Sequence, residues 1–327
     1  MGTGKIGIHL GEIAQIVLPV FVLAALGYIT ARTGYLSREA GDGLAAFVFN
    51  VAIPILLFRS IAFAEFPDIS PWTIWLTYLP AIVVAWIAAA VLIIIIARRG
   101  YRASVIGGVA AGFSNLVLVG IPLMERAYGQ AGLTIHFLLL AVHLPFMMAL
   151  STFLMEFAVR ADGVEKAPIS IKAVSTQLLT NFIKNPIIIG ILLGGFWRLA
   201  QLETPDSVVS ILDLLGKTAG PLALFALGMS FLKYSIRGNW QPAVGLALVS
   251  VLAMPAIALF FGTQVFVLPP LWLKVVVLAA ACPTGVNAYL FASYFKIAEG
   301  LASSSIIFAA LFSIPALPFW LMVLSAY

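Results

Sequence analysis

The sequence predicts an all-α integral membrane protein whose ten transmembrane helices form two inverted repeats of five helices each. Of its 327 residues, 62% are hydrophobic and only 9% are charged, whereas about a quarter of the residues in a soluble domain are charged. Apolar runs of roughly 20 residues, the length that crosses a bilayer, recur between polar breaks. Two of these runs, far apart in the chain, are interrupted by glycine, proline and small polar residues.

The composition also excludes several classes of function. The net charge of +5 does not indicate nucleic-acid binding, because lysine and arginine of a membrane protein collect in its cytoplasmic loops. The single cysteine, Cys282, excludes an internal disulfide and a cysteine-based metal cluster. No metal-ligand motif, catalytic triad or phosphate loop stands out in the sequence. We therefore expect no enzyme activity, no cofactor and no metal.

The spans follow one another with short connections, apart from one substantial loop. Ser37 and Thr204 precede the second and seventh spans and are predicted to be their N-caps. Pro54 and Pro221 should kink the same two spans, because proline lacks the N–H group that a helix needs. The predicted spans are residues 12–32, 38–62, 71–97, 103–128, 131–160, 178–201, 205–233, 240–263, 270–296 and 300–325.

The basic residues fall mainly on one side of this arrangement, and Lys217 alone is left within a span. The positive-inside rule makes the richer side cytoplasmic, so both termini are predicted outside a multi-pass protein of the cell's inner (plasma) membrane. The richer side carries Arg32, Arg38, Arg98, Arg99, Arg102, Arg160, Lys166, Lys172, Lys184, Lys233, Arg237 and Lys296, and the other side carries Lys5, Arg59, Arg126, Arg198 and Lys274.

An internal repeat emerges when the chain is aligned with itself at a near-constant offset. The aligned pairs include Gly27 and Gly194, Pro54 and Pro221, and Phe58 and Phe225 at an offset of 167, Ser114 and Pro283 and also Asn115 and Thr284 at 169, and Pro145 and Pro315 at 170. Five is an odd number of spans, so the second copy must enter from the opposite side of the membrane. We predict a first repeat at residues 1–160, a cytoplasmic linker at 161–177 and a second, inverted repeat at 178–327.

The stretches 112–122 and 281–287 are poorly suited to a regular helix. Their glycine, proline and small polar residues weaken or remove helical hydrogen bonds at a depth where lipid offers no substitute. Interrupted apolar segments at corresponding positions of two halves indicate the binding site of a secondary transporter.

Residues 115–124, which read NLVLVGIPLM, resemble the Asn-x-x-x-x-Gly-Ile-Pro-Leu signature of the auxin efflux carrier family, part of the bile acid and auxin carrier superfamily. Residues 283–292, PTGVNAYLFA, look like that family's second crossover motif. The resemblance extends over nearly the whole chain. Ser114 stands where plant members have proline, and the long central loop of plant members is missing, so auxin specificity is not carried over.

The resemblance implies that the fourth and ninth helices are broken and cross at the membrane centre. It also implies a scaffold domain of spans 1, 2, 6 and 7 and a transport domain of spans 3–5 and 8–10 that move against each other in an elevator-type cycle of alternating access. Family members carry organic anions, and bacterial relatives carry small dicarboxylates such as malonate or malate. The expected function is therefore secondary transport or uniport of a small mono- or dicarboxylate.

A broken helix exposes N–H groups at the start of its second half, where the helix dipole adds about half a positive charge. A carboxylate is the natural ligand of such a helix start. The alternative is that the polar residues only repair the backbone where the helices cross. The predicted substrate-binding residues are Ser114, Asn115, Pro283, Thr284, Gly285 and Asn287.

Ionisable side chains inside the spans are candidates for a coupling or support site, because charge at this depth is costly. Asp213 and Lys217 lie four residues apart on one helix and can pair, and Asn50 occupies the position equivalent to Lys217 in the first repeat. The pair is a static salt bridge, a site of substrate contact or proton coupling, or simply lies close to the outer surface. His143 is either a proton relay or a neutral histidine that donates to a carbonyl near Pro145.

The leading alternative function is a sodium-coupled symporter of the bile-acid type, which has a similar crossed-helix architecture. A membrane-embedded enzyme and a passive channel are more remote alternatives. Coupling to protons or to sodium is left open by the sequence. The expected partners are the organic anion and the lipid bilayer but not nucleic acid, and a homodimer is possible.

Overall fold

The computed structural model describes residues 10–63, 70–163, 184–236 and 240–327, and every named element among them is a helix. The basic residues Lys5, Lys166, Lys172 and Arg237 and most of the predicted linker at 161–177 lie outside these ranges. The α-helices are α1 (Leu10–Arg32), α2 (Arg38–Phe47), α3 (Ile53–Ala62), α4 (Pro71–Val91), α5 (Tyr101–Gly112), α6 (Ile121–Ala161), α8 (Pro186–Leu199), α9 (Asp206–Lys217), α10 (Ala219–Ser230), α11 (Gln241–Leu248), α12 (Met254–Phe260), α13 (Pro270–Ala280), α14 (Asn287–Phe295) and α15 (Glu299–Leu324).

Seven helical segments of the described chain are long and apolar enough to cross a membrane. One of them, Leu116–Ala161, is bent at Gly129, whose φ of 61° and ψ of −153° are not helical. Two shorter apolar helices, α8 and α13, accompany them. The other six segments are Gly11–Arg32, Arg38–Ala62, Pro71–Ile96, Asp206–Lys233, Gln241–Val265 and Glu299–Leu324. The prediction of a helical, multi-span membrane protein is thus confirmed.

Short π-helical turns interrupt several of these segments, and three of them end two residues before a proline. They are η1 (Val48–Ala52) before Pro54, η3 (Leu116–Gly120) before Pro122 and η5 (Val249–Ala253) before Pro255. Proline cannot donate to the carbonyl four residues earlier and its ring crowds that carbonyl, so the turn ahead of it widens. The remaining interruptions are η2 (Leu92–Ile96), η6 (Phe261–Val265) and the 3₁₀ turn η4 (Phe231–Lys233).

The two predicted N-caps have different outcomes. Ser37 caps α2, and its hydroxyl accepts a hydrogen bond from the N–H of Ala40 at 3.3 Å. The prediction for Thr204 was wrong, because α9 begins at Asp206 with Pro205 as its N-cap residue. The Thr204 hydroxyl instead accepts a hydrogen bond from the indole N–H of Trp197 at 2.8 Å, which ties the end of α8 to the next loop.

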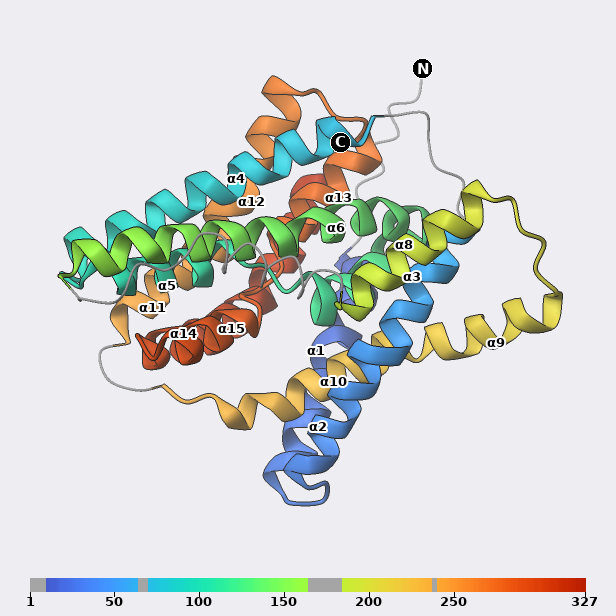
Figure 1. Cartoon of the computed structure of the whole chain (residues 1–327), viewed down its shortest axis with the longest axis horizontal. Coiled ribbons are helices and arrows are strands. Elements are labelled where there is room, and N and C mark those ends of the chain that lie inside the picture. Colours follow the sequence, from blue (N-terminus) through green and yellow to red (C-terminus); the bar gives the residue numbers. More distant parts are fainter. Residues whose placement is uncertain (1–9, 64–69, 164–183, 237–239) are drawn as a thin grey trace.

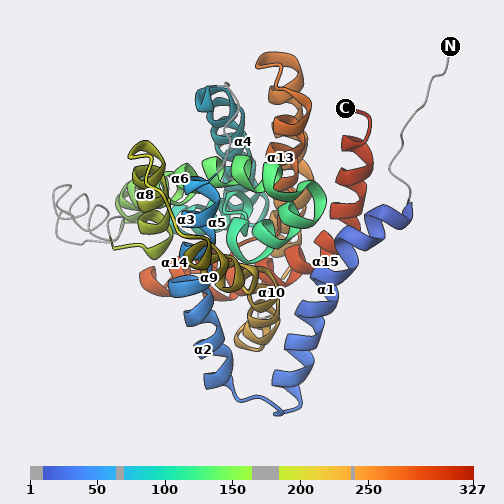
Figure 2. The ribbon, with the colours of Figure 1, turned by 90° about the vertical axis from the view of Figure 1, so that its right-hand side faces the viewer.

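The helices gather in two groups (Figure 1). One group contains α1, α2, α3, α8, α9 and α10, and the other contains α4, α5 and α6, which run side by side, together with α11 to α15. The turn between α1 and α2 forms one extremity of the molecule, opposite the C-terminal end of α15 (Figures 1 and 2). Both interrupted stretches lie where the groups meet, because η3 packs against α10 as well as against α6, and Pro283 and Thr284 line a cavity together with residues of α1 and α10.

Within the first group, glycines let helix backbones touch. A Cβ atom on Gly27 of α1 would overlap the carbonyl oxygen of Phe225 in α10, and a Cβ atom on Gly194 of α8 would overlap the carbonyl oxygen of Phe58 in α3. The sequence repeat relates the two contacts to each other, because at an offset of 167 residues Gly27 aligns with Gly194 and Phe58 aligns with Phe225. The helix pairs α1–α10 and α3–α8 therefore pack in the same way.

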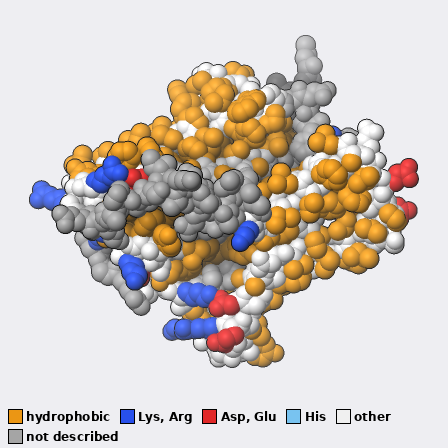
Figure 3. Space-filling view, viewed as in Figure 1, with side chains coloured by type: hydrophobic (Ala, Val, Ile, Leu, Met, Phe, Trp, Pro, Cys, Tyr) orange, Lys and Arg blue, Asp and Glu red, His pale blue; other side chains and the backbone are white. Residues whose placement is uncertain are grey.

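Hydrophobic side chains cover large parts of the face shown in Figure 3, as expected for a surface in contact with lipid. The lysine and arginine side chains visible on this face gather mainly along its left and lower margins, over the turn between α1 and α2 and the ends of α4 to α6. Two ion pairs involve such basic side chains: Lys233 pairs with Asp42, and Arg102 pairs with Asp162 at 3.1 Å.

Candidate functional site

The two interrupted stretches lie against each other at the centre of the molecule. The first break separates α5 from η3, and the second separates α13 from α14. Ser114 and Thr284 face each other in an isolated antiparallel bridge. On either side of this bridge, the N–H of Asn115 donates to the carbonyl of Pro283 at 2.8 Å, and the N–H of Gly285 donates to the carbonyl of Phe113 at 2.7 Å. Each break thus supplies hydrogen bonds that the other has lost.

The two hydroxyl groups of the bridge repeat this exchange. Thr284 Oγ1 donates to the carbonyl of Ala110 at 2.6 Å, and Ser114 Oγ lies 3.5 Å from the carbonyl of Ala280. In these two hydrogen-bonded pairs Ser114 has the same role as Thr284, and Ala280 has the same role as Ala110. Equivalent residues are therefore 170 positions apart in the sequence. The sequence alignment at 169, which matched Ser114 with Pro283, was therefore wrong by one residue, because side-chain identity at the breaks is too weak to set the register.

Asn115 begins the second half of the first broken helix. Its side-chain oxygen accepts a hydrogen bond from the N–H of Leu118 at 3.1 Å, so it acts as an N-cap. The N–H groups of Val117, Val286 and Asn287 at the two helix starts have no acceptor within the described ranges. Unpaired N–H groups at a helix start attract anions.

A cavity of about 530 Å³ lies beside the crossing, and Asn115, Val117, Val286 and Asn287 are among the residues that line it. Among the described residues, its lining includes Lys184 and the buried His143 but no aspartate or glutamate, so the fixed charge of these residues is positive. The other lining residues come from both breaks, from α6, from the start of α8 and from Phe49 of η1: Phe113, Ser114, Asn115, Leu116, Val117, Leu140, Leu144, Met148, Asn185, Pro186, Ile187, Ile188, Gly285, Val286, Asn287 and Leu290.

A second cavity, of about 490 Å³, lies on the other side of the crossing between α1, α10 and α15. Its walls are mostly apolar, with Tyr28, Tyr234 and Ser313 as polar exceptions besides the crossing residues. Asn115 lines both cavities, whereas Pro283 and Thr284 line only this one and Gly285 and Asn287 only the larger. Asn115 is therefore the residue that both spaces share.

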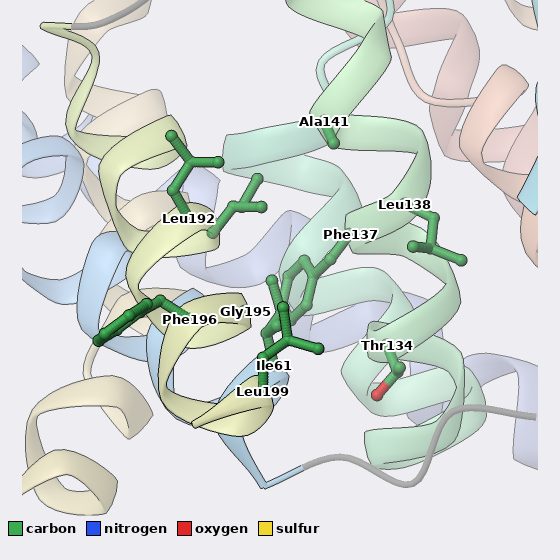
Figure 4. Close-up of a pocket in the computed structure, with 10 residues that line it drawn as sticks. Ile61, Thr134, Phe137, Leu138, Ala141, Leu192, Gly195, Phe196 and Leu199 are labelled. Atoms are coloured by element: carbon green, nitrogen blue, oxygen red, sulfur yellow. The ribbon is translucent and has the colours of Figure 1, made fainter. Parts of the chain in front are cut away.

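A third cavity, of about 450 Å³, lies away from the crossing between α3, α6 and α8 (Figure 4). Apart from Gly195 and Thr134 its lining is hydrophobic, with side chains such as Phe137, Leu192 and Phe196. The Thr134 hydroxyl already donates to the carbonyl of Gln130 at 3.0 Å. This cavity offers no binding group for an anion.

The structure brings all six predicted substrate-binding residues to the crossing, where they divide into two sets. Ser114, Pro283, Thr284 and Gly285 use the groups described above to hold the two breaks together. Asn115 and Asn287 are at the helix starts and line the larger cavity. The two sets overlap, because Ser114 and Gly285 also line the larger cavity and the backbone N–H of Asn115 donates to Pro283 across the crossing.

Two histidines of α6 lie beside the crossing. His143 is 1% exposed, and its Nδ1 lies 3.3 Å from the hydroxyl of Tyr78. The predicted partner, a carbonyl near Pro145, is not the one observed. His136 was missed by the sequence reasoning, although it lies seven residues before His143 and hence on the same helix face. Its Nε2 lies 2.8 Å from the carbonyl of Leu116, which can only accept, so Nε2 carries the proton.

The predicted pairing of Asp213 with Lys217 is replaced by a pairing with another helix. Arg59 of α3 lies 2.5 Å from Asp213 of α9, and both side chains are 30% exposed. Tertiary packing brings the guanidinium to the carboxylate, although 154 residues separate them in sequence. Asn50 donates to the carbonyl of Ala46 at 2.8 Å within its own helical segment and lines none of the three cavities.

Sequence comparisons match the chain to membrane transport proteins. A family model described as "Membrane transport protein" matches residues 13–321. The chain is 23% identical over 313 residues to a protein of Rhizobium meliloti (strain 1021) named "Putative malonate transporter", with 93% of each chain covered. It is 24% identical over 350 residues to auxin efflux carrier component 8 of Arabidopsis thaliana, with 93% of this chain and 95% of the relative covered.

A third relative is the uncharacterized transporter YfdV of Escherichia coli (strain K12), which is 23% identical over 315 residues, with 94% of this chain and 96% of the relative covered. Each of these relatives is aligned over nearly its whole length, so the similarity is not confined to the crossover motifs. The protein therefore belongs to the membrane transport protein family that includes the auxin efflux carriers.

Proposed function

We propose that the protein is a secondary carrier that moves a small organic anion, a mono- or dicarboxylate, across the cell's inner membrane. One observation carries this proposal: the starts of two half-helices meet in a cavity whose described lining contains Lys184 and no acidic side chain. The unpaired N–H groups of Val117, Val286 and Asn287 would donate to one carboxylate. The side-chain NH₂ group of Asn115 would add a further donor, because the N–H of Leu118 occupies only the side-chain oxygen of Asn115.

The donors lie one residue further along the second break than the sequence alone indicated. Gly285 gives its N–H to the carbonyl of Phe113, so the proposed carboxylate contacts begin at Val286. A charge bound there is stabilised by fixed dipoles in a site of low dielectric, where each dipole acts more strongly than in water. No lysine or arginine then needs to be buried at the centre of the crossing.

Transport requires that the site be opened alternately to the two sides of the membrane. We propose an elevator-type movement in which α1, α2, α3, α8, α9 and α10 form the scaffold and the remaining helices carry the crossing. The close glycine contacts of Gly27 with Phe225 and of Gly194 with Phe58 support a rigid scaffold. The two helix groups of Figure 1 support the division between the two domains.

The same contacts support ten spans in two inverted repeats. The bend at Gly129 would separate the fourth span from the fifth, and α8 would be the sixth. Residues 167 apart swap places in the two glycine contacts, and residues 170 apart face each other at the crossing. A pseudo-two-fold axis in the membrane plane would produce this symmetry. On this arrangement both termini lie outside.

The proposal is tested with purified protein in proteoliposomes. Uptake of radiolabelled malonate, malate and acetate is measured with and without a sodium gradient and at two pH values. We expect saturable uptake of at least one carboxylate and counterflow when the vesicles are preloaded with it. Uptake only with a sodium gradient would favour the bile-acid type of symport, and uptake that neither saturates nor shows counterflow would contradict a carrier. Ligand-induced thermal stabilisation ranks the candidates beforehand.

A further inference from the structure

Arg126 of α6 reaches across to α1, a helix of the other group. Its Nη2 donates to the carbonyl of Gln15 at 2.6 Å, and its Nε donates to the carbonyl of Ile16 at 3.2 Å. A carbonyl inside an α-helix normally accepts a hydrogen bond from the N–H four residues later. For Gln15 that residue is Pro19, which has no N–H. Arg126 therefore supplies the hydrogen bond that the proline removes from α1.

A second bond joins the same part of α6 to α3. The side-chain NH₂ group of Gln130 donates to the hydroxyl of Ser60, a buried residue, at 2.9 Å. Arg126 and Gln130 are four residues apart and would share one face of a regular helix. Gly129 lies between them, and its φ and ψ fall in a region that essentially only glycine occupies. This bend lets the two side chains reach different helices of the first group.

The bonds of Arg126 suit a contact that opens and closes. A charged donor strengthens a hydrogen bond, but these bonds are exposed, so water replaces them when the helices separate and their net stabilisation is modest. The contact of Gly27 with Phe225 inside the first group is different, because it joins two helix backbones directly. Releasable groups thus hold α6 to α1, whereas close packing holds α1 to α10.

We propose that Arg126 and Gln130 form a latch between the two helix groups, which positions α6 against α1 and α3 in this structure and opens when the groups move. This inference rests on the proposed function, in which α6 moves with the crossing. The latch joins the start of α1 and the end of α3, on the side predicted to be outside. Because α6 begins at Ile121, directly after η3, the latch acts close to the interrupted helix of the crossing.

The latch is tested by measuring a distance between the two groups. Spin labels on Gly11→Cys of α1 and Trp72→Cys of α4, two exposed positions, report it by double electron–electron resonance in a Cys282→Ala background. Arg126→Gln should raise the population of a second distance roughly three- to thirtyfold relative to the latched one. Arg126→Lys, which keeps the charge, should have a smaller effect. Arg32→Gln, at the other end of α1, is the matched control, because Arg32 is exposed and makes no hydrogen bond or ion pair with the described residues.

The proline provides a second test that leaves the arginine intact. Pro19→Ala restores an N–H to α1, so the carbonyl of Gln15 regains its helical donor and competes less for Arg126. It should shift the distances in the same direction as Arg126→Gln, and the double variant should shift them no further than Arg126→Gln alone. Pro80→Ala makes the same change inside α4 and should retain the wild-type distances.

Three outcomes separate the latch from a purely structural role and from the function on which it rests. Wild-type distances in Arg126→Gln, whether or not its unfolding temperature falls, would refute the latch, because the arginine would then only stabilise the fold. Additive shifts from Pro19→Ala and Arg126→Gln would also refute it, because the two residues would then act independently. If the wild type takes up no carboxylate, the carrier function fails instead, and the distances still report whether the latch exists.

Discussion

Asn115 donates its backbone N–H to the carbonyl oxygen of Pro283 at 2.8 Å, although 168 residues separate them in sequence. Each of these residues lies where its own helix has stopped making internal hydrogen bonds, and lipid cannot replace them. The crossing therefore satisfies backbone groups of both breaks at once, and the N–H groups that follow have no acceptor among the described residues and belong to residues that line a cavity. This relationship underlies the prediction for Asn115.

Replacing Asn115 by aspartate separates capping from anion binding. An aspartate oxygen can still accept the hydrogen bond from Leu118, so the helix start should survive. The added negative charge should repel a carboxylate and lower its affinity at least tenfold, about 1.4 kcal/mol. Binding is measured by calorimetry, and thermal unfolding of the same preparation reports the fold. Unchanged affinity in Asn115→Asp would place the ligand elsewhere.

The contact of Gly27 with Phe225 should not tolerate a methyl group. In Gly27→Ala the new Cβ would overlap the Phe225 carbonyl oxygen, so α1 and α10 must move apart, at a cost of roughly 1–3 kcal/mol. Gly43→Ala is the matched control, because a Cβ at Gly43 of α2 meets nothing within 4 Å. That control should stabilise its helix by roughly 0.5–1 kcal/mol. Equal unfolding temperatures for the two variants, measured in detergent, would contradict the close packing.

Asp162 should make part of the stability depend on pH. It accepts hydrogen bonds from the N–H groups of Tyr101 and Arg102 at 2.8 and 3.1 Å and pairs with the Arg102 side chain, so it caps α5. Partial burial opposes ionisation, but the hydrogen bonds from Arg102 and Tyr101 outweigh it and lower the pKa of Asp162 below its usual value. The charged form is therefore favoured by folding.

The sign of the pH effect follows from this lowered pKa. The stabilisation is complete above the unfolded pKa, about 3.9, and is lost as the pH falls through the lower folded value. Asp162→Asn keeps an acceptor but not the charge, so the difference in unfolding temperature between it and the wild type should be constant from pH 5 to 7 and shrink at more acidic pH. A difference that grows below pH 4 would show that Asp162 is not favoured in its charged form.

The ion pair of Asp213 should be energetically coupled to Arg59 and not to Lys217. In a double-mutant cycle, Arg59→Ala and Asp213→Ala should show a coupling energy of about 0.5–1 kcal/mol, a range suited to partly exposed charges. The matched cycle of Lys217→Ala with Asp213→Ala should give a value near zero. Chemical unfolding in detergent supplies both numbers. A larger coupling for the Lys217 pair would restore the interaction within α9.

His136 should be needed for the stability of the crossing. Its Nε2–H donates to the carbonyl of Leu116, and the side chain is fully buried. His136→Phe leaves this carbonyl without its donor, which should destabilise the protein by roughly 1–3 kcal/mol. Phe137→Leu, a substitution at the adjacent buried residue that changes only apolar packing, is the comparison. An unfolding temperature equal to that of the wild type would mean that another group replaces the histidine.

Features that depend on local chemistry could be read from the chain. The apolar runs predicted the helical segments, because a bilayer demands about 20 apolar residues whatever their partners. Pro54 predicted an irregularity in its span, and Ser37 predicted a helix start, because both act on their own neighbours. Thr204 failed as an N-cap because α9 begins two residues later, at Asp206, and the hydroxyl accepts from the indole of Trp197 across the turn.

The sequence by itself therefore determined a helical membrane protein with two interrupted segments, since hydropathy and missing N–H groups belong to single residues and short runs. Only the tertiary structure decided which partner each group found: Arg59 rather than Lys217 for Asp213, and Phe113 for the N–H of Gly285. It also brought Lys184, His143 and Asn115 to one cavity. Such pairings depend on how helices that are far apart in the sequence pack together in space. The sequence separation of two residues does not reveal whether they will meet.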